Sequence, residues 1–246
     1  MKHPIRPITA LLLAFASTLQ AAPPPQTTVS IVKDDFHING QPTYAGRAWN
    51  GHRIEGLIMN SRMVQATYDD FEVNNETDVK AYDHDILKPA RVHELIERVR
   101  KAERNGRRLL VGTSYGGGGI PKENVVRHSD FLLLHGNGIK DPAGITRMIR
   151  ETRRVPGFRP MPILINEDDH ENFDQPANNF SEAIAEHVSW GWFDFRRKGE
   201  GHEQGYQSPP VNWGISSPRK RAFFDYLKTI TNSEHRTNEV PSNHRP

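Results

Sequence analysis

Short apolar segments alternate with helical patterns along most of the chain, and this alternation is the feature that most constrains the fold. The apolar segments run for a few residues and end in polar or glycine-rich residues, as in "LLLHGNG" and "ILINEDDH". Such runs are typical of strands that are covered on both faces, and their alternation with helices indicates a parallel sheet. The expected strands are 71–76, 107–115, 130–138, 161–170 and 191–199, and the expected helices are 88–106, 121–128, 141–157, 178–190 and 217–230.

Capping and turn residues locate several element ends. Asp141 is expected to cap a helix that has Pro142 in its first position, and Ser217 is expected to cap the last helix. The pair Asn39-Gly40 lies between segments rich in strand-forming residues, which predicts a type I′ hairpin turn. An early strand is expected near Tyr44–Trp49.

The N-terminus has the pattern of a secretory signal peptide. Basic residues precede the apolar run "ITALLLAFAST", and small residues follow it. We therefore expect a signal peptide over residues 1–22, cleaved after Ala21 or Ala22, and an extended linker over 23–28. A secreted or periplasmic protein is predicted, with no membrane association after cleavage.

Composition limits the kinds of chemistry that are available. The chain has no cysteine, so the sequence excludes a disulfide framework and a thiolate nucleophile. The formal net charge is +2 with Lys and Arg scattered along the chain, which gives no reason to expect a nucleic acid partner.

Two expected strands end in the same pair of residues, Asn75-Glu76 and Asn166-Glu167. The two glutamates are 91 positions apart, which is about three units of a (β/α)8 barrel at roughly 30 residues each. If Glu76 ends the fourth strand, Glu167 ends the seventh. Two opposed carboxylates on one rim suit glycoside hydrolysis, where one group donates a proton and the other attacks the anomeric carbon.

At these residues the chain resembles the clan of retaining (β/α)8 glycoside hydrolases that includes cellulases and β-mannanases. The segment "VNNE" matches the strand-four motif of the clan, and "ILINE" matches the strand-seven motif. The resemblance implies that Glu76 is the acid/base, Glu167 the nucleophile and Asn75 the partner of the sugar 2-hydroxyl. It covers most of residues 30 to 230 and implies an oligo- or polysaccharide substrate and no cofactor. The glycosidase-like barrel domain is expected over 29–230, with a disordered tail over 231–246.

Other side chains near the strand ends are candidates for binding sugar. His135 ends the strand before that of Glu167 and is placed to bond the nucleophile or a sugar hydroxyl. The aromatic candidates for stacking on sugar rings are Tyr115, Trp49, Trp192, Trp213 and Tyr206. Of Trp190 and Trp192, which bracket a strand start, at least one is expected in the core. The segment "NEDDH" places Asp168, Asp169 and His170 together, but consecutive residues of a strand are not expected to converge on one ion, and we expect no metal.

The barrel is expected to be incomplete. Only about two dozen residues separate the early strand from Phe71, where three units need roughly 90. Strands two and three are therefore missing, with the shortening near residues 70 and 71. A shortened barrel has open sheet edges, which favour self-association and weak activity.

Two other functions are consistent with the sequence. One is a non-catalytic carbohydrate-binding protein built on a decayed barrel. The other is a serine α/β-hydrolase, because "GTSYG" over 112–116 matches G-x-S-x-G with Ser114 as nucleophile. Three further glycines and Pro121 follow this serine, whereas a nucleophile elbow leads directly into a helix.

Overall fold

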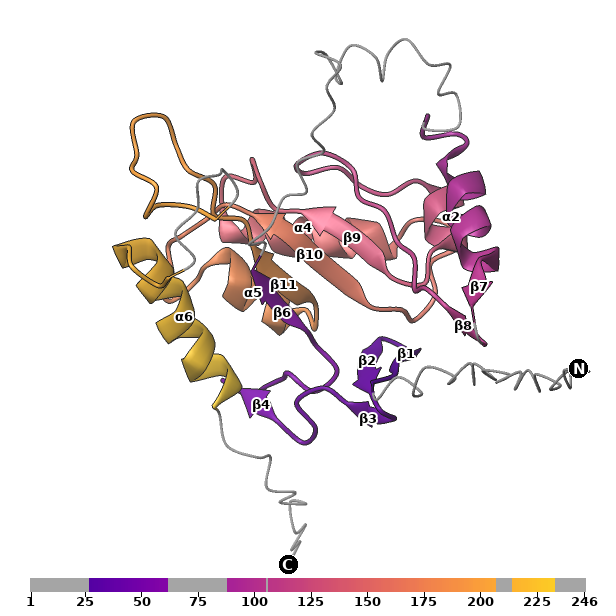
Figure 1. The fold of residues 1–246 in the computed structure, drawn as a ribbon, viewed down its shortest axis with the longest axis horizontal. Helices are drawn as coiled ribbons and strands as arrows, with labels where there is room; N and C mark the ends of the chain where they lie inside the picture. Colours follow the sequence, from indigo (N-terminus) through magenta and orange to yellow (C-terminus); the bar gives the residue numbers. More distant parts are fainter. Residues whose placement is uncertain (1–26, 62–87, 105, 207–213, 233–246) are drawn as a thin grey trace, which may run out of the picture.

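Four parallel strands form the central sheet of the computed structural model, which describes residues 27–61, 88–104, 106–206 and 214–232 (Figure 1). The elements of the N-terminal part are β1 (Val29–Val32), β2 (Asp35–Ile38), β3 (Gln41–Pro42), β4 (Ala48–Trp49), β5 (His52–Arg53) and β6 (Met59–Ser61). Those of the remainder are α2 (Val92–Lys101), β7 (Glu103–Arg104), β8 (Arg107–Arg108), α3 (Glu123–His128), β9 (Leu132–His135), α4 (Pro142–Arg153), β10 (Ile163–Asp168), α5 (Asn179–Ala185), β11 (Ser189–Trp192) and α6 (Pro218–Thr231).

The strand order of this sheet is β6-β11-β10-β9, and every neighbouring pair is parallel. The early strand β6 lies beside the late strand β11, with Trp190 paired with Met59 and Trp192 with Ser61. The sheet therefore joins a segment from near the start of the chain to the end of its strand-helix series. Such pairing of an early strand with a late one also occurs when a parallel sheet closes into a barrel.

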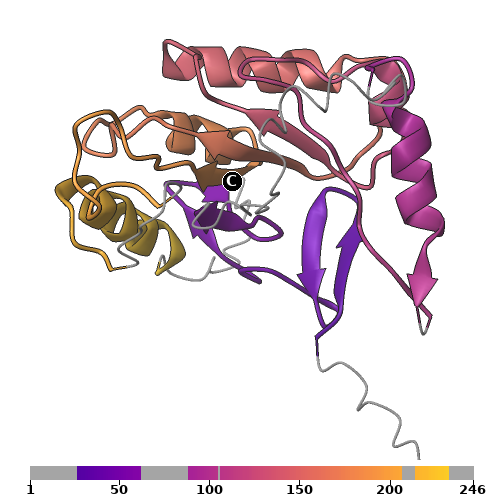
Figure 2. The same ribbon diagram turned by 45° about the horizontal axis from the view of Figure 1, so that its top comes forward.

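Helices α4 and α5 cover one face of the sheet, and the N-terminal hairpins lie toward the amino ends of the strands, where Asp35 contacts His187 just before β11 (Figures 1 and 2). Leu132 and Leu134 of β9 are fully buried, whereas Leu133 and His135, which alternate with them, are half-buried. The alternation follows from the pleat of the strand, which points successive side chains to opposite faces. The covered face carries the main core, and the other face is the more accessible one.

Aromatic rings fill the core next to β11. Trp190 stacks on Phe180 of α5 with 4.5 Å between ring centroids, and Trp192 stacks on Phe223 of α6 at 4.8 Å. All four rings are buried. Because large aromatic side chains remove much apolar surface from water, these contacts hold α5 and α6 against the sheet.

Three helix and turn predictions are confirmed. The Asp141 side chain accepts a hydrogen bond from Gly144 N with Pro142 in the first turn, and Ser217 caps α6 in the same way through Lys220 N. Asn39 and Gly40 both have positive φ, 52° and 80°, as a type I′ turn between β2 and β3 requires. The hairpin extends into a three-stranded meander, β1-β2-β3.

Two strand predictions are wrong in place or extent. The early strand of the parallel sheet is Met59–Ser61, whereas Ala48–Trp49 forms a two-stranded hairpin with β5. Of the strand expected over 107–115, only Arg107–Arg108 is a strand, paired with β7. The following residues run beside β9 with the bond from Asp130 N to Val111 O at 2.8 Å.

Helix α5 ends earlier than the sequence pattern suggests, and β11 starts earlier for the same reason. His187 has a φ of 53°, and Val188 N bonds Ala183 O at 2.8 Å while His187 N bonds Ile184 O at 2.9 Å. These two bonds are those of a Schellman motif, which ends a helix in a left-handed residue. Glycine usually occupies that position and marks the end of a helix in the sequence. Because His187 occupies it here, the sequence pattern did not indicate where α5 ends.

The described residues thus form a mixed α/β protein with a four-stranded parallel sheet and five helices. The expected signal peptide, the strand 71–76 and the tail beyond residue 232 lie outside them. None of the helices in the described ranges has the length and apolar character needed to cross a membrane.

Candidate active site

Glu167 and His135 lie side by side where β10 and β9 end. The two residues are paired in the sheet register, and Gly136 N donates to Glu167 O at 2.7 Å. His135 Nε2 is 3.6 Å from Glu167 Oε2, and Asn137 Nδ2 donates to Oε1 at 3.4 Å. The side chains of Glu167 and His135 are 15% and 16% exposed. The carboxylate is therefore oriented by two neighbours while part of it remains accessible.

The next residue, Asp168, has a different environment. Its side chain is fully buried and accepts hydrogen bonds from Asn179 Nδ2 at 2.8 Å, Trp190 Nε1 at 3.0 Å, and both the backbone N and the Nδ1 of His170 at 3.1 and 2.5 Å. The carboxylate of Asp168 raises the pKa of His170, and burial acts in the opposite direction. Asp168 therefore fixes the strand end from the helix-covered side, which leaves Glu167 as the partly accessible carboxylate of β10 itself.

Several buried polar atoms near the same sheet edge have no hydrogen-bond partner. They are Asn60 Oδ1 of β6, Tyr115 OH, Asn137 Oδ1 and Asn166 Oδ1. The loop of Tyr115 lies against the end of β9, where Gly118 N donates to His135 O at 3.0 Å. A buried polar group costs about 1–3 kcal/mol when it stays unpaired, so a cluster of such groups at one edge favours a polar ligand there.

Two groups of carboxylates and a histidine have the spacing of metal ligands. The ligand atoms of Asp168, Asp169 and His170 lie within 4.8 Å of one another, closer than consecutive residues were expected to come. In this group His170 donates its Nδ1 hydrogen to Asp168, and the raised pKa of His170 favours the protonated ring. A protonated histidine does not bind a metal, so hydrogen bonding explains the group better.

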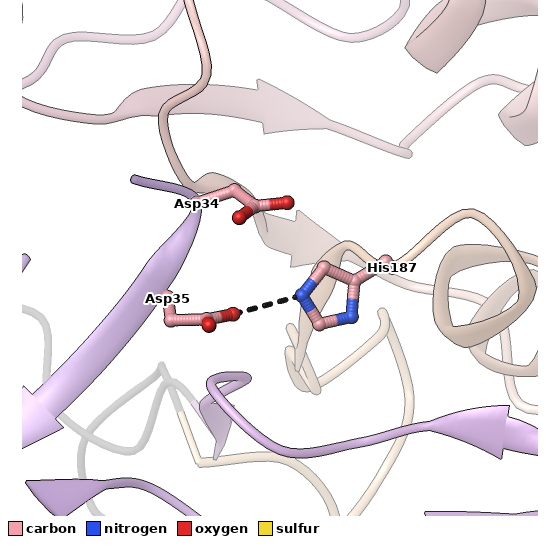
Figure 3. A group of neighbouring side chains, drawn as sticks. All are labelled: Asp34, Asp35 and His187. Carbon is pink, nitrogen blue, oxygen red and sulfur yellow. Dashed lines mark hydrogen bonds and ion pairs between the residues drawn. The ribbon is translucent and has the colours of Figure 1, made fainter. Parts of the chain in front are cut away.

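The second group, Asp34, Asp35 and His187, lies at the opposite end of the sheet, before β11 begins (Figure 3). The guanidinium of Arg53 contacts two members of this group: its Nη1 is 2.9 Å from Asp35 Oδ2, and its Nη2 is 2.7 Å from His187 Nε2. His187 Nε2 is also 3.1 Å from Asp35 Oδ1, and its Nδ1 lies 3.2 Å from Arg53 O. A guanidinium in this position disfavours a cation, so the group ties the N-terminal meander to the turn before β11.

Two aromatic residues expected to bind sugar are placed elsewhere. Trp192 is 1% exposed and packs between Phe173 and Phe223, which makes it a core residue. Trp49 packs edge-on against Tyr226 with ring centroids 5.8 Å apart. Its strand β4 lies beside the lower end of α6 (Figure 1), whereas Glu167 is the last residue but one of β10. The aromatic contacts of both rings are with the core or with α6.

The remaining candidates divide into two sets. Tyr206 is 1% exposed and packs edge-on to Trp192. Asn75, Glu76 and Trp213 lie outside the described residues. The site is therefore built here from Glu167, His135 and the polar residues around them.

Ser114 lacks the setting of a nucleophile elbow. An elbow serine lies at a sharp turn directly from strand to helix. Here Ser114 follows a segment without regular structure, and the next helix, α3, begins at Glu123. This arrangement agrees with the glycines that follow Ser114 in the sequence.

An ion-pair network lies in the loop after β11. Asp194 is 4% exposed, and Arg219 Nε donates to it at 2.6 Å, while Arg219 Nη1 donates to Glu200 at 2.5 Å. Burial raises the pKa of Asp194, and the hydrogen bond from Arg219 lowers the pKa of Glu200 to about 2. Burial raises the pKa of Tyr206 to about 12. This network anchors the loop after β11 to the start of α6.

Sequence reasoning missed Asn137 and the network of Asp194 and Arg219. Asn137 had a visible signal, because it lies in "HGNG" at the end of an expected strand, where ligands of parallel sheets bind. Asp194 and Arg219 are 25 positions apart, and no local pattern links them.

No family model matches the chain, and no curated protein or solved structure matches it. The fold and site alone therefore define the class: a mixed α/β protein with a polar site at the carboxyl ends of a parallel sheet.

Proposed function

We propose that the protein is a secreted glycoside hydrolase-like protein in which Glu167 is the nucleophile. The observation that carries this proposal is the position of Glu167: it is partly accessible at the carboxyl end of β10 and oriented by His135 and Asn137. The unpartnered amide and phenol oxygens at the same edge suit a ligand rich in hydroxyl donors.

The chemistry follows the retaining scheme of the clan that the sequence resembles. Glu167 Oε attacks the anomeric carbon while the glycosidic C–O bond breaks, and Glu76 gives its proton to the leaving oxygen. Water then attacks the same carbon, cleaves the ester to Glu167 and returns a proton to Glu76. Asn75 is proposed to bond the 2-hydroxyl of the sugar. His135 and Asn137 hold the two oxygens of Glu167 in place.

We further propose that the barrel is shortened and that turnover is slow. Residues 62–87 connect β6 to the next described segment. This connection is shorter than the roughly 30 residues that one strand-helix unit needs. The side chains that bind substrate at the ends of the second and third strands of a complete barrel would then be absent. A drift of about 1 Å in the reacting groups costs on the order of 100-fold in rate.

The proposal is tested by trapping the nucleophile. The mature protein is incubated with a panel of 2-deoxy-2-fluoro-β-glycosyl fluorides, which form a slowly hydrolysed ester with a retaining nucleophile, and the peptides are mapped by mass spectrometry. We expect the sugar on Glu167 in the wild type and in Asp169→Asn, and no label in Glu167→Gln. Label on another carboxylate, or unchanged turnover by Glu167→Gln, would contradict the proposal.

Two further measurements separate the other functions from this one. A carbohydrate-binding protein without catalysis would bind an oligosaccharide in calorimetry but take no fluorosugar label. A serine hydrolase would react with a fluorophosphonate, and Ser114→Ala would abolish that reaction. For the proposed acid/base, Glu76→Ala is expected to recover part of its activity in azide on substrates with good leaving groups, because azide needs no general base.

A further inference from the structure

Strand β1 is the outer strand of the N-terminal meander, and one of its edges is free of any strand among the described residues. On its inner side β1 pairs antiparallel with β2. Thr28, which precedes β1, donates from its backbone N to Asn39 Oδ1 and accepts at its backbone O from Asn39 N. Hydrogen-bonded and non-bonded pairs alternate in an antiparallel ladder. The backbone N–H and C=O groups of Val29 and Ile31 therefore point away from β2, toward the free edge.

A groove runs along this edge. Two adjoining cavities of about 470 and 430 Å³ share Val29, Arg108 and Leu110 in their walls. The far wall is the extended segment 107–110, and Leu109 in it is 69% exposed. The groove is thus open, and residues of a strand with unused hydrogen-bonding groups line it.

The walls of the groove are positively charged. They carry four cations, Lys33, Arg107, Arg108 and Arg159, and one carboxylate, Asp130.

The charge of that carboxylate is already balanced. Arg108 Nη1 and Nη2 donate to Asp130 at 2.7 and 2.9 Å, Arg100 lies 3.5 Å away, and the pKa of Asp130 is lowered. No carboxylate of the described residues lies within ion-pair distance of Lys33 or Arg159. The side-chain hydrogen bonds of Arg159 go to backbone carbonyls. An anionic ligand would therefore gain favourable interactions with Lys33 and Arg159.

We propose that this groove binds an extended acidic peptide of a partner protein, which adds to β1 as a further strand. The free N–H and C=O groups of Val29 and Ile31 supply the backbone hydrogen bonds, and the cations select acidic side chains. A second copy of this chain is a poor occupant, because it would bring its own lysine and arginines against the same cations. An acidic polysaccharide would meet the cations but has no strand backbone to satisfy the edge.

The test uses the mature protein and a fluorescent, acetylated peptide of about eight alternating glutamate and threonine residues, a common strand length. We expect saturable binding by fluorescence anisotropy, and no binding of the same peptide with lysine in place of glutamate. On binding, the amides of Val29 and Ile31 should become protected from hydrogen exchange.

A matched peptide separates strand addition from simple charge attraction. Methylation of every backbone nitrogen keeps every carboxylate but removes the donors from both edges of the peptide. We expect the methylated peptide to bind at least about tenfold more weakly, a difference of about 1.4 kcal/mol. Equal binding of the two peptides, equal competition by polygalacturonate, or no binding would overturn the proposal.

Variants of the protein locate the site. Lys33→Gln combined with Arg159→Gln should weaken binding by about tenfold, while Arg154→Gln, which removes an exposed cation away from the groove, should not. Ile31→Pro removes one free edge donor and should also weaken binding, whereas Ile31→Val should not. Glu167→Gln should bind the peptide like the wild type, so this test is independent of the proposed hydrolase activity.

Discussion

The indole Nε1 of Trp190 donates a 3.0 Å hydrogen bond to Oδ2 of Asp168. This bond joins β11 to the end of β10 inside the core, next to the candidate nucleophile. Gly136 lies close against the same carboxylate, since a Cβ there would be 2.2 Å from Asp168 Oδ2. One buried carboxylate therefore fixes the position of Glu167, although Glu167 itself remains accessible.

Replacing Asp168 with alanine should destabilise the fold strongly. The change leaves Trp190 Nε1 and Asn179 Nδ2 without their acceptor in a buried site and removes the partner of His170. Each unsatisfied buried group costs about 1–3 kcal/mol, so we expect a loss of about 3 kcal/mol or more in the free energy of unfolding. Urea denaturation measures the loss. Asp169→Ala is the matched control, because that side chain is partly exposed, and a loss of similar size there would contradict the role given to Asp168.

Stability should depend on pH through His170. The hydrogen bond to Asp168 raises the pKa of His170 above its unfolded value near 6.5. The protonated ring is therefore favoured in the folded state, and its stabilising effect is complete below the unfolded pKa and lost as the pH rises through the folded pKa. Unfolding free energies of wild type and His170→Gln, measured from about pH 5.5 to about pH 8.5, should converge as the pH increases. His52→Gln, at an exposed position, is the control for the substitution itself, and its unfolding free energy should stay within about 0.5 kcal/mol of the wild type.

Loss of Arg219 should loosen the loop after β11. Arg219→Ala leaves the buried Asp194 without its 2.6 Å partner and releases Glu200. Removal of one partner of a buried ion pair costs about 3–5 kcal/mol. We expect a loss near the lower end of that range, together with faster hydrogen exchange across residues 193–206. Lys228→Ala, which removes an exposed ion pair on the same helix, should cost less than about 1 kcal/mol. Equal exchange rates in the two variants would argue against the anchoring role.

The sequence predicted elements whose signals are local. Helix α4 follows from Asp141, Pro142 and an apolar face, and its cap bond is present in the structure. Boundaries that depend on tertiary contacts were not predictable in the same way. Helix α5 ends before a left-handed His187, whose ring is held by Asp35 of β2 and Arg53 of β5.

The same distinction applies to the candidate site. The position of Glu167 at a strand end was readable, because polar residues follow a short apolar run. The burial of the aromatic candidate Trp192 under α6 was not readable. The expectation that at least one of Trp190 and Trp192 lies in the core is confirmed, because α5 covers Trp190 as well. Strand β6 has only three residues, and it became recognisable through its partner β11.

The contact between Gly191 and Asn60 tests the pairing of β6 with β11. The two residues are partners in the parallel register, and a Cβ on Gly191 would lie 1.4 Å from Asn60 Oδ1. The φ of Gly191 is outside the left-handed region, so alanine is tolerated by the backbone and would by itself gain about 0.4–1 kcal/mol from reduced unfolded-state entropy. We nevertheless expect Gly191→Ala to lose about 1–3 kcal/mol, because the methyl group displaces the Asn60 side chain from a packed position.

The double variant Gly191→Ala with Asn60→Ala should recover most of this loss, because the second change removes the obstructing amide. The coupling energy between the two sites, measured by a double-mutant cycle in urea, should exceed about 1 kcal/mol. Gly116→Ala is the control, since a Cβ there meets no atom within 4 Å, and it should lose no stability and gain at most about 0.4–1 kcal/mol. Strictly additive effects of the Gly191 and Asn60 substitutions would mean that β6 does not lie against β11, and the link between the early and late strands of the sheet would have to be abandoned.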